Sequence, residues 1–216
     1  GRSGRSRMVV KNAVGSFAIK VASMIIDFIK VPIYLTFLDS AYYGIYLTIA
    51  SIVSWTHQFD FGLGTGLRYK LTQAISLENE ERGKQLVSTA YISMAVIMLM
   101  VLILSIPLIV NVNWPNILNC SFIDASELIL CIIMVSAVFV IQFVLELISV
   151  VLQADQRAAI STVFKPIANF FSLVTILVLI PLYHNSLTIA CLALTVPIVI
   201  VLFIANIYFF NKRYKK

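Results

Sequence analysis

Six long apolar segments, separated by short polar stretches, follow one another along the chain. They cover roughly residues 13–37, 43–61, 86–110, 127–152, 159–182 and 187–210. A helix needs about 20 mostly apolar residues to cross a bilayer core of about 30 Å. The pattern therefore predicts an all-α, polytopic membrane protein with a bundle of six transmembrane helices.

Composition supports a membrane protein and argues against a nucleic-acid binder. Of the 216 residues, 60% are hydrophobic and 12% are charged, and the mean hydropathy is +0.96, far more apolar than a soluble domain. The formal net charge is +6, but the basic residues form short clusters between apolar segments and no basic face. We expect residues 1–7, which repeat Gly, Arg and Ser, to be a non-native or disordered leader, and residues 8–216 to form one six-helix transmembrane lobe.

The placement of Lys and Arg predicts the orientation in the membrane. These residues occur before the first segment, between the second and third, between the fourth and fifth, and after the sixth, whereas the other three loops contain none. Because positively charged loops stay in the cytoplasm, both termini are predicted to be cytoplasmic. In the first of these internal basic loops, Leu67, Leu71, Ala74 and Ile75 recur at helical spacing, which predicts a short helix lying along the inner membrane surface.

A polar stripe runs along the first segment. A charge at mid-membrane costs roughly 2.5–3.5 kcal/mol on an insertion scale, so Lys20, Asp27 and Lys30 need partners. At about 100° of rotation per residue, one face holds Asn12, Ser16, Lys20, Ser23, Asp27, Lys30 and Tyr34. The stripe is either an internal cluster that holds helices together or the wall of a hydrophilic pathway, and its continuation to both ends of the segment favours the pathway.

Shorter polar faces occur on three other segments. Gln58 lies on the second, Gln142 and Glu146 on the fourth, and Lys165 on the fifth. The candidate pathway residues are therefore Lys20, Asp27, Lys30, Lys165, Gln58 and Gln142. Asp60 and Glu146 are candidates for coupling transport to protons or cations. The third and sixth segments are apolar almost all round, and we expect them to face lipid.

The sequence contains no arrangement typical of catalysis or of a metal site. Cys120, Cys131 and Cys191 lack the spacing of a metal site or a disulfide framework. His57 and His184 fall at opposite membrane boundaries and cannot share a site. We expect no disulfide, no metal, no cofactor and no enzymatic activity.

A glycine-rich stretch follows the second segment and reads Asp60-Phe61-Gly62-Leu63-Gly64-Thr65-Gly66-Leu67-Arg68. Glycines at 62, 64 and 66 permit a bend or a close approach of the backbone, so we expect a hinge bordered by Arg68. The spacing matches neither a phosphate loop nor a dinucleotide fingerprint.

This stretch also carries a family resemblance. Together with Tyr43-Gly44-Ile45-Tyr46 and Ser54-Trp55, it resembles the amino-terminal signature of the polysaccharide (O-antigen and capsule repeat unit) flippases in the multidrug/oligosaccharidyl-lipid/polysaccharide exporter superfamily. The resemblance implies a MATE-like lobe of a carrier that moves an undecaprenyl-diphosphate-linked oligosaccharide across the bacterial inner (cytoplasmic) membrane by alternating access, in polysaccharide or lipopolysaccharide biosynthesis.

The resemblance further implies that this chain supplies only one of two lobes. It corresponds to the amino-terminal six-helix half, whether a natural half or a fragment, and a second six-helix half from the same or a separate chain is expected to complete the cavity. In this interpretation Lys20, Lys30 and Lys165 attract the diphosphate of the lipid-linked substrate.

Two other functions remain open. The same superfamily includes cation-coupled multidrug exporters, although the excess of Lys over carboxylate in the first segment argues against a cationic drug. A polytopic glycosyl- or phosphotransferase acting on polyprenyl phosphate is the third candidate. Such enzymes generally carry acidic metal-binding motifs in cytoplasmic loops, and here those loop acids are Glu78, Glu80 and Glu81, which form no clear constellation.

Overall fold

The protein is an all-helical bundle. The computed structural model describes residues 2–55, 62–120, 122–179, 182 and 186–212, and only the backbone of residues 2–13, 16, 53–55 and 212. No β-strand occurs in these ranges, and five of the helical stretches in them are long and apolar enough to cross a membrane. These findings confirm the predicted all-α, polytopic bundle.

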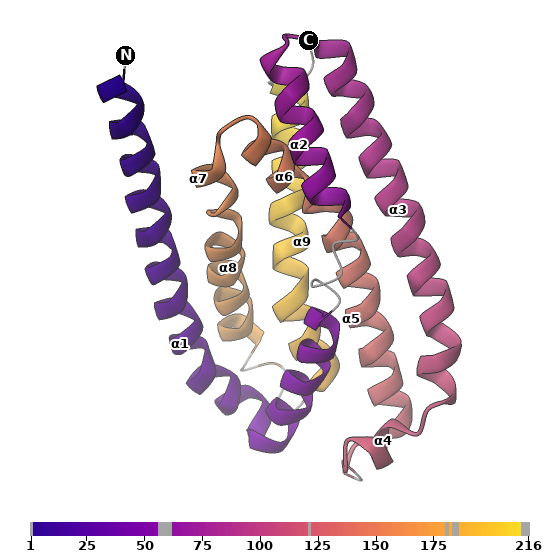
Figure 1. Cartoon of the computed structure of the whole chain (residues 1–216). Helices are drawn as coiled ribbons and strands as arrows, with labels where there is room; N and C mark the ends of the chain where they lie inside the picture. The colour runs from indigo at the N-terminus through magenta and orange to yellow at the C-terminus, as the bar shows by residue number, and fades with distance from the viewer. Residues whose placement is uncertain (1, 56–61, 121, 180–181, 183–185, 213–216) are drawn as a thin grey trace.

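The first helical stretch contains the first of the six predicted spans and residues 43–55 of the second, whose last residues, 56–61, lie outside the described part of the chain. α1 (Arg2–Trp55) is interrupted at Asp39, a non-helical residue with a φ of 52° and a ψ of 164°, and its ribbon doubles back on itself (Figure 1). We call residues 2–38 the first arm of α1 and residues 40–55 its second arm. The apolar part, Phe17–Ile52, has 36 residues; as one straight helix it would measure about 54 Å, far more than one crossing needs. Residues 2–7, the predicted leader, have helical backbone.

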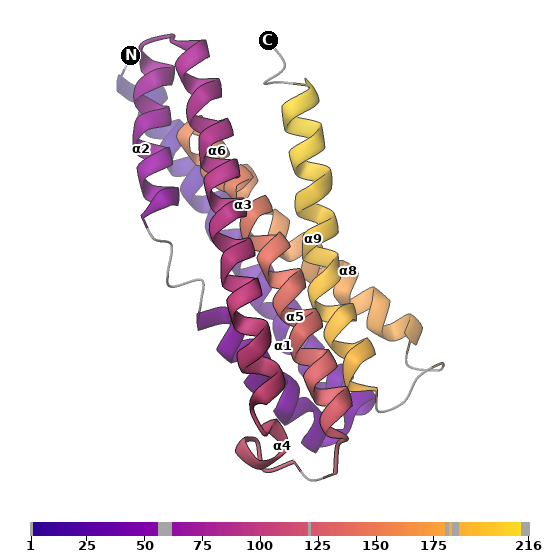
Figure 2. The ribbon, with the colours of Figure 1, turned by 90° about the vertical axis from the view of Figure 1, so that its right-hand side faces the viewer.

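α2 (Leu63–Ser76) and α3 (Glu80–Asn111) form a helical hairpin. The apolar face of α2, made of Gly64, Leu67, Leu71 and Ala74, is buried, and the helix packs against α3 and against α6 (Leu147–Ala154). Both views show α2 running alongside α3 (Figures 1 and 2). The expectation that this helix lies along the membrane surface was therefore wrong, because an apolar face predicts burial but does not distinguish lipid from a neighbouring helix.

The remaining spans follow the predicted boundaries closely. After the short α4 (Trp114–Ile117), the fourth span consists of α5 (Ala125–Leu145) and α6, which break at Glu146. The fifth consists of α7 (Ala158–Ser161) and α8 (Phe164–Leu179), and the sixth is α9 (Leu187–Lys212).

α9 packs one face against α5 and α8 and also touches α1 and α6. Its buried side chains include Leu187, Cys191, Leu202, Asn206 and Phe209. The opposite face of α9 exposes large apolar side chains, among them Ile200, Phe203, Ile204 and Ile207. The expectation that the sixth span faces lipid therefore holds for one face only, since a face covered by apolar neighbours is as apolar as one that faces lipid. α3 does expose large apolar side chains, among them Ile92, Leu99, Ile103, Leu104 and Leu108.

The helices define two ends of the bundle. At one end α1 begins, the α2–α3 hairpin turns and α9 finishes; at the opposite end lies α4 (Figures 1 and 2). We call these the α2 end and the α4 end. In the orientation predicted by the positive residues, the α2 end is the cytoplasmic one.

Candidate functional site

The inner part of the predicted polar stripe faces α8. Lys30 Nζ donates to Asn169 Oδ1 (2.8 Å), and Asn169 Nδ2 donates to Asp27 Oδ1 (2.7 Å). One turn further along, the hydroxyls of Tyr34 and Ser172 share a hydrogen bond of 2.9 Å. These five residues form a polar contact between two helices, which we call the α1–α8 seam.

The helical repeat explains why these residues meet. Residues three or four apart lie on the same face of a helix, so Asp27, Lys30 and Tyr34 form a single row on α1. Asn169 and Ser172, three apart, form the matching row on α8. In a bilayer such polar groups must find partners inside the protein, and here each row supplies the partners of the other. This part of the stripe therefore links α1 to α8, and the pathway role of the stripe stays a prediction.

Burial differs sharply within the seam. The side chain of Lys30 is 11% exposed, whereas that of Asp27, 3.8 Å away, is 52% exposed. Tyr34 and Ser172 are buried. In the charged part of the seam, the ammonium of Lys30 is therefore buried, whereas the carboxylate of Asp27 is still partly exposed.

The two other candidate lysines are exposed. Lys165 lies one helical turn before Asn169 on α8 and is exposed. Lys20 is exposed on α1, ten residues or about 15 Å before Lys30 along the helix. The ion pair of Lys30 and Asp27 in the seam thus has Lys165 nearby on α8, and Lys20 lies further toward the α2 end.

The remaining polar candidates lie elsewhere or outside the described residues. Gln142, partly buried, and Glu146, exposed, lie at the junction of α5 and α6, where the Glu146 N–H donates to the Gln142 carbonyl (2.9 Å). Gln58 and Asp60 fall in the 56–61 segment, outside the part of the chain that the structure describes. The Asp60–Glu146 coupling pair stays a prediction.

Of the glycine motif, Gly62 carries the bend. Its φ of 70° is in the left-handed region, and it caps the start of α2, where its carbonyl accepts from the Gly66 N–H (2.8 Å). Gly64 is buried against the neighbouring helices. A Cβ at Gly66 would meet nothing within 4 Å, so nothing in the structure explains that glycine. Arg68 is exposed on the outer face of α2.

Sequence reasoning missed Asn169, the residue that joins Asp27 to Lys30. A signal for it existed, because Asn169 is four residues after Lys165 and three before Ser172, and therefore on the polar face that was recognised on the fifth span. Among the described residues, no group of three or more His, Cys, Asp or Glu is placed to hold a metal ion.

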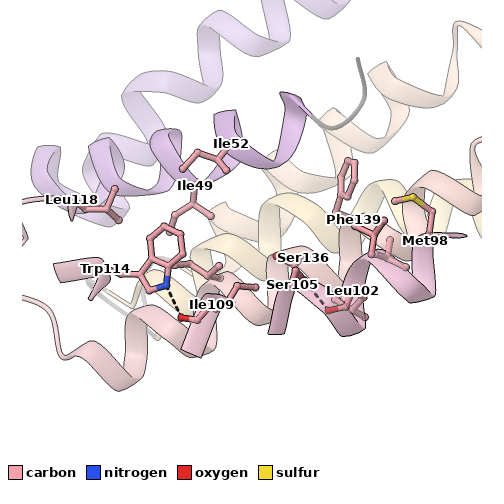
Figure 3. Close-up of a pocket in the computed structure, with 13 residues that line it drawn as sticks. Ile49, Ile52, Met98, Leu102, Ser105, Ile109, Trp114, Leu118, Ser136 and Phe139 are labelled. Atoms are coloured by element: carbon pink, nitrogen blue, oxygen red, sulfur yellow. Dashed lines mark hydrogen bonds between the residues drawn. The ribbon is translucent and has the colours of Figure 1, made fainter. Parts of the chain in front are cut away.

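Two cavities lie apart from the seam. The first, of about 280 Å³, is enclosed by the second arm of α1 with α3, α4 and α5. Figure 3 shows Ile49 facing Trp114 at one end of it and Met98 beside Phe139 at the other. Trp114 Nε1 donates to the Ile109 carbonyl (2.7 Å), so even this polar group is satisfied by the protein, and the cavity offers an almost wholly apolar lining.

The second cavity, of about 840 Å³, opens at the α2 end. Its wall combines apolar side chains such as Leu71, Val87 and Phe210 with Glu78, Glu80 and Lys84 at the α2–α3 turn.

No protein-family model, no curated protein and no solved structure matches this chain. The family resemblance therefore depends on the motif residues of the second span and on the polar stripe alone.

Proposed function

We propose that this chain is one six-helix lobe of a flippase that carries an anionic, lipid-linked oligosaccharide across the bacterial inner membrane by alternating access. The cargo is a polyprenyl-diphosphate glycan. In the predicted orientation both termini are cytoplasmic, and a second six-helix half, from the same or another chain, supplies the opposite wall of the pathway. The role is transport and not catalysis.

The observation that carries this proposal is the placement of three lysines and one carboxylate along the facing sides of α1 and α8. Lys30 binds Asn169 across the α1–α8 seam, Lys165 lies one turn before Asn169, and Lys20 lies further along α1. The carboxylate, Asp27, is half exposed. Ionisable groups within a membrane span are costly, and they generally mark the route of a substrate or ion. The net positive charge suits a diphosphate and repels a cationic drug.

The chemistry of Lys30 suits a ligand that moves through. An ammonium carries three donors, and one of them is directed at Asn169. Lys offers a compact point charge rather than the bidentate fork of Arg, so it attracts phosphate oxygens without fixing their geometry. A diphosphate can thus replace Asp27 as the counter-charge of Lys30, while Asn169 keeps the carboxylate in place through its own N–H.

The experiment neutralises the lysines in the chromosomal gene and measures surface polysaccharide on gels, with the protein level checked by immunoblot. Lys20→Ala and Lys30→Ala are expected to abolish surface polysaccharide at unchanged protein level. Lys84→Ala, which removes an exposed charge outside the stripe, is the matched control and is expected to have no effect.

Lys20 is the decisive position, because its exposed side chain is not needed for packing. Normal polysaccharide in both Lys20→Ala and Lys30→Ala cells would reject the pathway. An equal loss of surface polysaccharide in Lys84→Ala cells would show that transport depends on the overall charge of the chain and not on the stripe.

A further inference from the structure

Two cysteine side chains meet between α5 and α9. The Sγ atoms of Cys131 and Cys191 are 2.9 Å apart, although 60 residues separate them in the sequence. Both side chains are fully buried, at 0% and 1% exposure. The absence of paired cysteine spacing predicted no disulfide, but the bundle brings these two thiols into contact.

The two cysteines also lie at matching depth. α5 and α9 both run from the α4 end toward the α2 end (Figures 1 and 2). Cys131 follows the start of α5 by six residues, about 9 Å, and Cys191 follows the start of α9 by four, about 6 Å. A disulfide bond is about 2.05 Å long, so the two sulfurs need to approach by only about 0.9 Å. The two helices therefore already hold the two sulfurs close together.

We propose that Cys131 and Cys191 are a reversible dithiol–disulfide pair that cross-links α5 to α9 near the α4 end. Both residues lie within stretches able to span a membrane and in a cluster of apolar side chains that includes Leu128, Ile132 and Leu187. A water-soluble oxidant has poor access to such a site, so the co-reactant is a lipid-soluble quinone, which reaches the two buried thiols when α5 and α9 move apart transiently.

The reaction balances with that partner. One thiol loses its proton and its sulfur forms a bond to the other sulfur, which also gives up its proton. The two electrons and two protons pass to the quinone, which becomes a hydroquinone. No other atom of the protein changes.

The cross-link has a mechanical consequence. With the bond formed, α5 and α9 cannot separate near the α4 end, whereas the α1–α8 seam contains no covalent restraint among its five residues. The bond forms whether or not the chain transports a glycan, so this proposal and the proposed function fail independently.

The test counts thiols in the purified full chain. The protein is reduced, treated in detergent with duroquinone, denatured, and labelled with a maleimide carrying polyethylene glycol, so that each free thiol adds one gel shift. Wild type is expected to show three adducts before oxidation and one after, with three again after reduction. Cys120→Ser, which removes the third buried cysteine, is expected to show two before and none after.

The single variants of the pair complete the test. Cys131→Ser and Cys191→Ser are each expected to keep both remaining thiols after quinone treatment. Three labelled thiols in oxidised wild type would overturn the proposal. Loss of thiols in Cys131→Ser, or quinone-induced dimers on a non-reducing gel, would overturn it as well. Because wild type and Cys120→Ser leave the pair intact, misfolding of the other variants does not obscure the result. Oxidation should also raise the Tm of both, since the bond closes a long loop of the unfolded chain.

Discussion

The α1–α8 seam and the contact between α5 and α9 join membrane helices by different means. At the α1–α8 seam, hydrogen bonds and one ion pair connect Asp27, Lys30 and Asn169. Along α5 and α9 the buried side chains are mainly apolar, such as Leu128, Phe139 and Leu202. Lipid gives helices no hydrophobic reason to associate, so the two contacts depend on polar bonds in one case and on close packing in the other.

This difference separates the part of the bundle that can change partners from the part that cannot. A charged ligand can take the place of Asp27 beside Lys30, and Asp27 is already half exposed. Packed apolar side chains fit closely against one another, and the lipid chains that would replace them fit less closely. We therefore expect α5, α6 and α9 to form the rigid part of the lobe, with the first arm of α1 able to move against it.

The largest loss of stability is expected from the packed contact. Leu202 on α9 is 2% exposed and belongs to the main apolar cluster. Leu202→Ala should lower the free energy of unfolding by about 2–5 kcal/mol, because the removed side chain leaves a cavity. Unfolding in detergent mixtures measures this. The exposed Leu104→Ala on α3 is the matched control, and an equal loss in both variants would contradict the assignment of the core.

Asn206 is the polar exception on α9, and the next largest effect is expected there. Its amide accepts from Tyr91 Oη (2.7 Å) and donates to the Leu145 carbonyl (3.0 Å), next to the break between α5 and α6. Asn206→Leu leaves both groups without this partner, which should cost about 1–3 kcal/mol. Tyr91→Phe removes one of these bonds and should cost less. If Asn206→Leu leaves the free energy of unfolding unchanged, hydrogen bonds contribute little to stability on this side of the bundle.

A smaller effect is expected when Asn169 is changed at the α1–α8 seam. Asn169→Leu removes both the acceptor of Lys30 and the donor to Asp27, but Asp27 is half exposed and stays 3.8 Å from Lys30. The cost should be about 1.5 kcal/mol, near the lower end for a hydrogen bond to a charged group. Replacing both partners by apolar residues, as in Lys30→Met with Asn169→Leu, should restore most of the loss. A double variant that is less stable than Asn169→Leu would show that Lys30 has further partners.

The sequence predicted the helices well and their neighbours poorly. The spans at 127–152, 159–182 and 187–210 match the structure to within a few residues at most ends, because span length and apolar composition follow directly from bilayer thickness. The position of α2 was mispredicted, since its apolar face does not specify its partner. The sequence also did not show which face of α9 would be buried, since α9 lacks a polar face to orient it.

For the candidate site, the limit lies in contacts between distant residues. The stripe of Asp27, Lys30 and Tyr34 was visible from helical periodicity, and Asn169 could have been recognised from its spacing to Lys165. Cys131 and Cys191 gave no such signal, because their contact depends on α5 and α9 packing in one register. Local spacing determines which residues share a helix face, whereas tertiary packing determines which faces meet.

The smallest expected effect concerns the buried hydrogen bond between Tyr34 and Ser172. It tests most directly how the α1–α8 seam differs from the contact between α5 and α9. Interhelical hydrogen bonds of this kind average about 0.6 kcal/mol in membrane proteins and reach about 1.7. Tyr34→Phe, Ser172→Ala and the double variant form a cycle that isolates the pairwise contribution, measured by unfolding in detergent mixtures. We expect a coupling near the average, because both groups are buried but neither is charged. A coupling near zero would mean that the apolar parts of these side chains, and not their hydroxyls, hold α1 to α8, and the distinction between the two helix contacts would then rest on Asp27, Lys30 and Asn169 alone.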